Sequence, residues 1–223
     1  GLEGRDRDNL FLASLLHDIG ISSSQLKLEA RQLDIPEELL EHCAKGRQML
    51  ECFPPLTDIG DIIYHHHDKW RGPNPSGISK EEIPLLSRIV FIADRLDSQL
   101  ERDRYILLQK DDVMGRLQEY SGAYFCPDLM DSLWDVSKKD FFWLDMTSEV
   151  MWDSLKEEGA HIDVKVDTQG MKSIAHIFSQ IIDGKSRFTA RHSQGVAKLA
   201  REIAARYGFS KNEQDKFEVA GLL

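Results

Sequence analysis

Six histidine and aspartate side chains have the types and order of residues that could bind a divalent metal ion. The set consists of His17, Asp18, His42, His66, His67 and Asp94. Imidazole nitrogens and carboxylate oxygens are ligands that iron, manganese and zinc accept. Apolar helical sequence surrounds nearly all of these residues, which predicts a buried site. A buried metal centre with such ligands can support hydrolysis.

Helical periodicity in two segments directs several of these side chains toward the core. At about 100° per residue, the isoleucines between positions 59 and 63 define an inward direction, and His66 falls near its centre. His67 lies at one border, and His65 points away, so His65 is the weakest ligand candidate of the three. On the later helix, Asp97 falls near the middle of the apolar stripe and Asp94 at its edge. Because an unpaired buried charge is costly, both carboxylates need a partner, and a metal ion is one.

The same residues also have ordinary structural interpretations. His17 can end a helix while Asp18 stabilises a turn, and His42 can be a half-buried helix residue. The histidine run at 65–67 can be a solvated helix end, and Asp94 can pair with a neighbouring arginine. All candidates nevertheless face or border the apolar side of a helix. This shared placement favours the metal interpretation for the set.

Composition limits the classes of function. The chain has 223 residues, of which 41% are hydrophobic, enough for one substantial core or one core and part of another. Its net charge of -10 argues against a nucleic-acid partner, and no apolar run approaches the roughly 18 residues of a membrane span. Cys43, Cys52 and Cys126 form no CxxC pair, which predicts reduced thiols and a cytoplasmic location.

The pattern of apolar residues predicts an all-α fold. Helices are expected over 8–17, 34–49, 57–67, 85–100, 113–120 and 127–136. Asp34 and Thr57 are the expected caps of the second and third, and Pro84 and Pro127 open later helices. The segment 21–25 is expected to be a loop. Only 161–166 has a period close to two, and it is either a short strand or a linker.

The order of these motifs resembles the HD superfamily of metal-dependent phosphohydrolases, and specifically its HD-GYP branch, over residues 5–150. The segments LLHDIG, HCAKG, HHHDKWRG, EIPLLSRIVFIADRLDSQ and GAYFCPDLM resemble successive motifs of that branch. The spacing is similar too, with 25 residues from His17 to His42, 24 from His42 to His66 and 27 from His67 to Asp94.

This resemblance implies an HD-domain helical bundle with phosphodiesterase activity, acting on a cyclic dinucleotide in bacterial cyclic di-GMP signalling. It makes the six residues metal ligands for one to three ions of iron, manganese or zinc, with His17 and Asp18 as the catalytic pair and Asp18 bridging two ions. The expected partners are a phosphodiester or nucleotide ligand and a second copy in a homodimer. Arg71, in the loop over the site, either binds a substrate phosphate or is a solvated cation.

Two residues and one loop depart from the HD-GYP pattern. Ile21 replaces the lysine after HDIG, the loop after Trp70 reads RGPNPSG and lacks GYP, and Asp68 replaces a glutamate. Loss of the lysine removes a cation expected near the substrate phosphate. These changes raise an alternative, a catalytically degenerate HD domain without metal that acts as a regulatory or dimerisation module. A nucleotide phosphohydrolase of the broader superfamily is a third interpretation.

The C-terminal part resembles the beginning of another HD-GYP domain. The family's opening helix is not found upstream of His17, whereas a similar segment surrounds His192, and DNLFLASLL at 8–16 aligns with DKFEVAGLL at 215–223. We therefore expect a degenerate first HD-GYP-like domain over 1–158, a linker over 159–170 and the first helices of a second domain over 171–223, as in a tandem protein. If the two parts pack together, His192 would join His17 and Asp18 as a further metal ligand.

Overall fold

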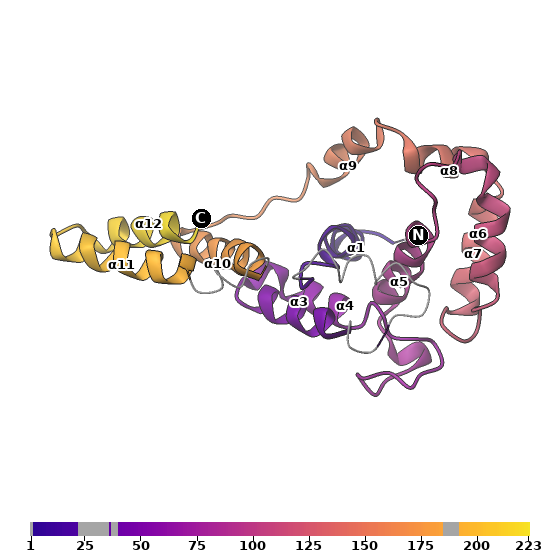
Figure 1. Cartoon of the computed structure of the whole chain (residues 1–223), viewed down its shortest axis with the longest axis horizontal. Helices are drawn as coiled ribbons and strands as arrows, with labels where there is room; N and C mark the ends of the chain where they lie inside the picture. The colour runs from indigo at the N-terminus through magenta and orange to yellow at the C-terminus, as the bar shows by residue number, and fades with distance from the viewer. Residues whose placement is uncertain (1, 22–35, 37–39, 185–191) are drawn as a thin grey trace.

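The computed structural model describes residues 2–21, 36, 40–184 and 192–223, which fold into helices joined by loops (Figure 1). The α helices are α1 (Arg5–Leu16), α3 (Glu41–Glu51), α4 (Thr57–Tyr64), α5 (Leu85–Ser98), α6 (Lys110–Gln118), α7 (Pro127–Ser137), α8 (Asp140–Thr147), α9 (Met151–Gly159), α10 (Thr168–Gly184), α11 (His192–Arg206) and α12 (Lys211–Leu222). Short 3-10 helices occupy η2 (Pro54–Leu56), η3 (Lys80–Glu82) and η4 (Ile106–Leu108). The described residues contain no strand, so the predicted all-α fold is confirmed.

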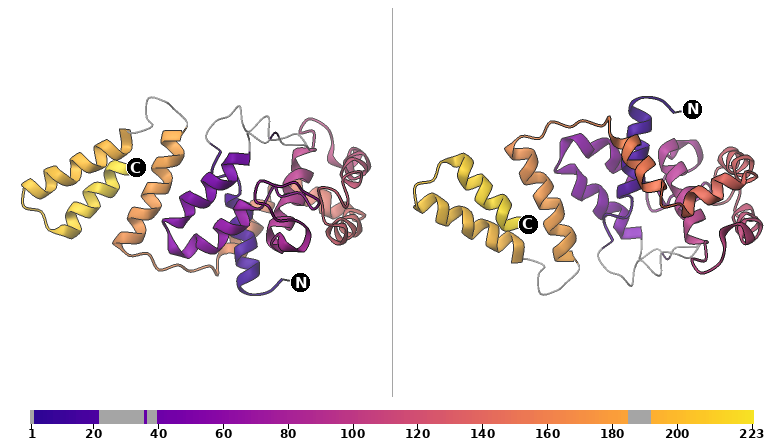
Figure 2. Two further views of the ribbon diagram at one scale, coloured as in Figure 1. Left: turned by 90° about the horizontal axis from the view of Figure 1, so that it is seen from below. Right: turned by 90° about the horizontal axis from the view of Figure 1, so that it is seen from above.

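The helices form three groups along the long axis of the molecule (Figures 1 and 2). The central group is α1, α3, α4 and α5, with α6, α7 and α8 at one end and α10, α11 and α12 at the other. An extended segment, 162–167, leads from the α9 end to α10. None of the helices within the described ranges is long and apolar enough to cross a membrane.

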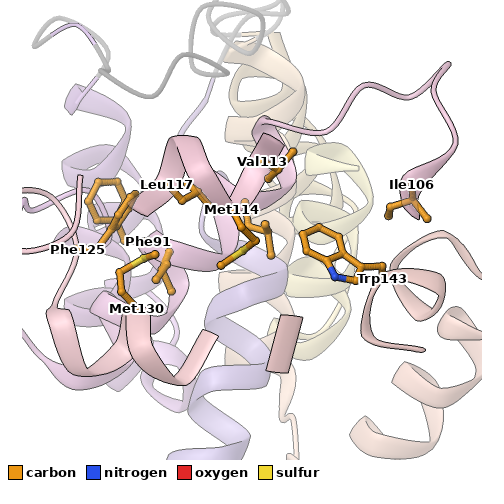
Figure 3. Close-up of a cluster of buried hydrophobic side chains, with 10 residues drawn as sticks. Phe91, Ile106, Val113, Met114, Leu117, Phe125, Met130 and Trp143 are labelled. Atoms are coloured by element: carbon orange, nitrogen blue, oxygen red, sulfur yellow. The ribbon is translucent and has the colours of Figure 1, made fainter. Parts of the chain in front are cut away.

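Helix α5 lies between two hydrophobic clusters. Its Val90 packs in the cluster of the central helices, together with residues of α1, α3 and α4. Its Phe91, Ile92 and Leu96 belong to a second cluster with residues of α6, α7 and α8, shown in Figure 3. Because the two clusters cover α5 on two sides, they fix the position of this helix and of Asp94, which the helix carries.

Burial on two sides changes which residues of α5 face the solvent. The prediction of one apolar stripe placed Asp97 near its centre, but the Asp97 side chain is 58% exposed and pairs with Arg102 at 2.7 Å. Arg95, by contrast, is buried. The prediction for Asp97 is therefore wrong. Because α5 packs against two clusters, its buried residues do not lie in one stripe, and the stripe expected from the sequence does not describe them.

Most other predicted helices occur, with shifted ends. Pro127 is the first residue of α7, and Pro84 directly precedes α5, as expected. Thr57, however, is the first residue of α4 rather than its cap, because its backbone N–H already bonds to Pro54 O in the preceding 3-10 turn. The expected start of the second helix at Asp34 lies outside the described residues, as does the expected loop 22–25, and the structure begins α3 at Glu41.

The C-terminal helices pack through small residues. Ala175, Ala197 and Leu222 form a cluster between α10, α11 and α12. A Cβ atom on Gly221 would lie 2.5 Å from Ala197 Cα, so only glycine permits this approach of α11 and α12. Helix α10 begins at Thr168, so the last residues of the predicted linker 159–170 are helical. The division into domains at that linker stays a prediction.

The predicted capping box of α12 is present. Ser210 Oγ accepts a hydrogen bond from the Glu213 backbone N–H at 3.4 Å, and the Glu213 carboxylate accepts one from Ser210 N–H at 2.8 Å. Ser210→Ala should lower the free energy of unfolding of the C-terminal helices by about 1 kcal/mol. Hydrogen exchange of the α12 amides measures this change. Ser154→Ala, the same substitution inside the exposed helix α9, should leave α12 protection unaltered, and equal protection in both variants would contradict a capping role.

Candidate metal centre

The structure brings the six predicted ligand residues together from four segments. His17 and Asp18 follow the end of α1, His42 is in the first turn of α3, the His66–His67 pair follows α4, and Asp94 is in α5. His17 Nε2 lies 3.7 Å from Asp18 Oδ2 and 3.7 Å from Asp94 Oδ1. His42 Nε2 lies 3.6 Å from Asp18 Oδ1 and 3.3 Å from His66 Nε2. We call these six residues the donor cluster.

His67 completes the donor cluster. Its ring centroid is 3.9 Å from that of His66 and 5.1 Å from that of His42. Its Nδ1 lies 3.9 Å from Asp94 Oδ2. His67 thus links the histidines at the buried end of the cluster to the carboxylate of α5.

Backbone carbonyls orient two of the histidine rings. Helix α4 ends at Tyr64, and in the turn that follows, His66 Nδ1 lies 2.5 Å from Ile63 O. His17 Nδ1 lies 2.9 Å from Ser14 O in the last turn of α1. With Nδ1 donating to a carbonyl, each ring presents Nε2 to the cluster. Such outer contacts set the tautomer of metal-binding histidines in proteins.

Burial keeps two of the histidines neutral. Desolvation, followed by the charge of His42, lowers the pKa of His66 to about 3. Desolvation also lowers the pKa of His67 well below its usual value. Neither ring nitrogen of His67 has a hydrogen-bond partner in the described part of the chain. A buried imidazole with both nitrogens unsatisfied fits a metal ligand, because an ion would supply the missing interaction.

The other end of the donor cluster carries charge. Burial opposes protonation of His17, but the Asp94 hydrogen bond and the Asp18 charge outweigh it and raise the pKa of His17 to about 9. Burial would raise the pKa of Asp94, yet His17 and Arg95 lower it to about 2. In the metal-free protein this end therefore holds a positive charge between two carboxylates.

A cavity of about 400 Å³ opens beside the charged end of the cluster. His17, Asp18 and Asp94 line it, together with Arg102, which sequence reasoning did not single out. Arg102 could have been predicted from the sequence because it lies just beyond the helix that carries Asp94. The predicted substrate residue Arg71 is exposed on the loop after α4 and is not among the residues that line this cavity.

His65 is outside the donor cluster, as its predicted direction indicates. Its Nδ1 lies 2.6 Å from Asp68 Oδ2, which also accepts a 2.6 Å hydrogen bond from Ser76 Oγ. These contacts hold the loop after α4.

The structure does not bring His192 to the donor cluster. It is an exposed residue at the start of α11, in the helix group farthest from α5 (Figures 1 and 2). Helix α10 contacts α3 of the central group. The expected packing of the two parts therefore occurs through α10, which leaves His192 away from His17 and Asp18.

Ile21 stands where the HD-GYP pattern has a lysine. Its surroundings give a physical reason for this difference. Ile21 is buried and lines a small cavity with Met49 of α3 and Ile181 of α10. A lysine there would place its side chain in the same cavity, which Lys45 also lines. Isoleucine suits this position because burial of an unpaired ammonium group is costly.

Cys43 is a neighbour of the cluster that sequence reasoning missed. Its Sγ lies 3.6 Å from His42 Nε2 and 3.6 Å from His66 Nδ1, and the side chain is buried. Desolvation, followed by the charge of Asp68, raises the pKa of the thiol. The sequence indicated this neighbour only through the position of Cys43 directly after His42.

Comparison with known proteins agrees with this fold. Residues 1–99 match the family model of the HD domain, so this part of the chain is similar to that family. The match is to the HD domain in general and does not distinguish the HD-GYP branch.

Two curated relatives are phosphodiesterases of Vibrio cholerae serotype O1. The chain is 28% identical over 223 residues to the 3'3'-cGAMP-specific phosphodiesterase 1, covering 96% of this chain and 51% of that protein. It is 28% identical over 198 residues to the 3'3'-cGAMP-specific phosphodiesterase 3, covering 85% and 41% respectively. The chain thus spans about half the length, or less, of these relatives.

A solved structure shares the fold. A cyclic GMP-AMP-specific phosphodiesterase of V. cholerae superposes with a TM-score of 0.65 at 20% identity, covering 96% of this chain and 58% of that one. The helical architecture described above is therefore found in a known structure.

Proposed function

We propose that this chain is part of a metal-dependent phosphohydrolase that cleaves a phosphodiester bond of a cyclic dinucleotide. The observation that carries this proposal is the assembly of six ligand side chains from four segments beside a cavity of about 400 Å³. The names of the curated relatives support the substrate class. Retention of all six side chains in contact favours this function over a regulatory module that has lost its site.

In this proposal, the donor cluster holds one or more divalent ions, and iron, manganese and zinc all accept its nitrogen and oxygen ligands. Such ions, when bound, polarise phosphoryl oxygens and lower the pKa of water. His66 and His67 act as neutral nitrogen donors at the buried end. Asp18 lies between the two ends, within 3.7 Å of His17 and 3.6 Å of His42.

Arg95 orients the carboxylate of Asp94. Its Nε and Nη2 lie 3.2 and 2.6 Å from Asp94 Oδ2, which leaves Oδ1 directed to His17. Because Arg95 is buried, its side chain has little freedom and the carboxylate orientation is fixed. Arg95 is therefore a positioning residue in this proposal, and it does not need to touch the substrate.

The proposed function is tested by turnover of a substrate panel. The purified chain, loaded separately with manganese, iron(II) or zinc, would be incubated with 3'3'-cGAMP, cyclic di-GMP, bis(p-nitrophenyl) phosphate and ATP. We expect metal-dependent opening of at least one cyclic dinucleotide to a linear product. Stoichiometric metal without phosphodiester turnover would instead favour the regulatory module, and turnover of ATP alone would favour a nucleotide phosphohydrolase.

Arg102 is the candidate cation for a substrate phosphate. It lines the cavity, and its exposed pair with Asp97 is weak enough to be exchanged for a phosphate. Arg102→Gln should raise KM for a cyclic dinucleotide about tenfold, since a charge-assisted hydrogen bond contributes about 1.5–3 kcal/mol. Steady-state kinetics measures the change. Arg104→Gln is the matched control because Arg104 pairs with Asp112 outside the cavity, and equal KM values in both variants would refute this role.

A further inference from the structure

The buried end of the donor cluster contains a sulfur atom as well as nitrogen atoms. His42, Cys43, His66 and His67 are all buried, and one candidate ligand atom from each lies within 4.8 Å of the others. The thiol of Cys43 faces two of these rings, at 3.6 Å from His42 Nε2 and 3.6 Å from His66 Nδ1. Four potential ligands therefore surround one small volume.

Two of the distances are those expected between ligands of one tetrahedral ion. With metal–nitrogen bonds of about 2.0–2.1 Å and metal–sulfur bonds of about 2.3 Å, a tetrahedral site separates two nitrogens by about 3.3 Å and nitrogen from sulfur by about 3.6 Å. His42 Nε2 lies 3.3 Å from His66 Nε2 and 3.6 Å from Cys43 Sγ. The side chains already have this spacing.

His67 supplies an independent indication of a ligand at this position. It is buried, and no hydrogen bond to either ring nitrogen is present in the described part of the chain. His67 and Cys43 also line the same small cavity, together with Asp68 and Ser76. An ion bound between them would satisfy the imidazole that the protein alone leaves unsatisfied.

We propose that Cys43 is a sulfur ligand of an ion held with His42, His66 and His67. This inference rests on the proposed metal-dependent function and specifies one end of its site. On binding, the thiol releases its proton to solvent and a metal–sulfur bond forms. Since thiolate is a soft ligand, this end prefers zinc to manganese, whereas the carboxylates of Asp18 and Asp94 suit harder ions at the other end.

X-ray absorption spectroscopy of the zinc-loaded wild-type chain tests the proposal directly. We expect a sulfur neighbour at about 2.3 Å in addition to nitrogen and oxygen neighbours at about 2.0–2.1 Å. Cys43→Ser should lose the sulfur neighbour. Cys52→Ser, the matched control, should retain it, because Cys52 is exposed and its Sγ donates to Met49 O instead.

A second measurement uses the cobalt(II)-loaded chain. Cobalt–thiolate bonding produces a charge-transfer absorption in the near ultraviolet, which we expect in wild type and Cys52→Ser but not in Cys43→Ser. Bound zinc with only nitrogen and oxygen neighbours in wild type would overturn the role of Cys43 and leave the proposed function intact. Failure of the wild-type chain to bind any metal would overturn both. The wild-type spectrum decides the matter even if Cys43→Ser does not fold.

Discussion

Asp18→Asn is expected to lower turnover of a cyclic dinucleotide at least about 100-fold, because even residues that only support a metal ligand cost about 10–100-fold when mutated. Asp18 is the residue that joins the two ends of the donor cluster. One oxygen lies 3.7 Å from His17 Nε2 and the other 3.6 Å from His42 Nε2. Conversion to an amide removes the negative charge that both ends share, so ligands on both sides lose a partner.

The loss should be measured as kcat/KM together with the metal content of the purified variant. Asp61→Asn is the matched control, since Asp61 is exposed on α4 and pairs with Arg47 at 3.1 Å. The control should retain wild-type activity and metal. Full activity of a folded Asp18→Asn chain would contradict the assignment of Asp18 to the site.

Metal removal is expected to abolish turnover and to lower the stability of the central helices. The ion binds the folded chain, where the ligands are assembled, and not the unfolded chain, where they are dispersed. Saturation at 100 times the dissociation constant stabilises the folded state by about 2.7 kcal/mol. For a chain of this size, such a change corresponds to a rise in Tm of about 5–10 °C. Circular dichroism during heating, with chelator or with zinc, measures the shift.

Adjacent histidines provide the control for this effect. His66→Gln should lose most of the metal-dependent rise in Tm, because His66 is fully buried within 3.3 Å of His42 Nε2. His65→Gln should keep the rise, since His65 contacts Asp68 outside the donor cluster. Identical Tm values with chelator and with metal in the wild-type chain would argue against a bound ion.

The sequence predicted much of the site because the chemistry is concentrated in a few segments. Each histidine or aspartate alone has an ordinary interpretation, but six such positions at family-like intervals formed one pattern. Local periodicity also placed His66 nearer the core than His65, and His66 is fully buried whereas His65 contacts Asp68, although both lie in a turn after α4 and not in the helix itself.

The errors arose where a residue has neighbours from more than one element. Asp97 was assigned to a buried stripe, but the packing of α5 between two clusters leaves it exposed and buries Arg95 instead. Thr57 was assigned as a cap, but a 3-10 turn leads directly into α4. Neither packing on a second face nor a turn made by the preceding segment is visible in the period of one helix.

By itself, the sequence determined the helical class and predicted the six candidate ligand positions, because these depend on residue chemistry and on spacing along the chain. Only the tertiary structure decided which side chains meet. It placed Cys43 beside His42 and His66, brought Arg102 to the cavity and kept His192 on a distant helix. Contacts between segments far apart in the chain depend on how helices pack on one another. That packing is set by all their apolar faces together and not by any single motif.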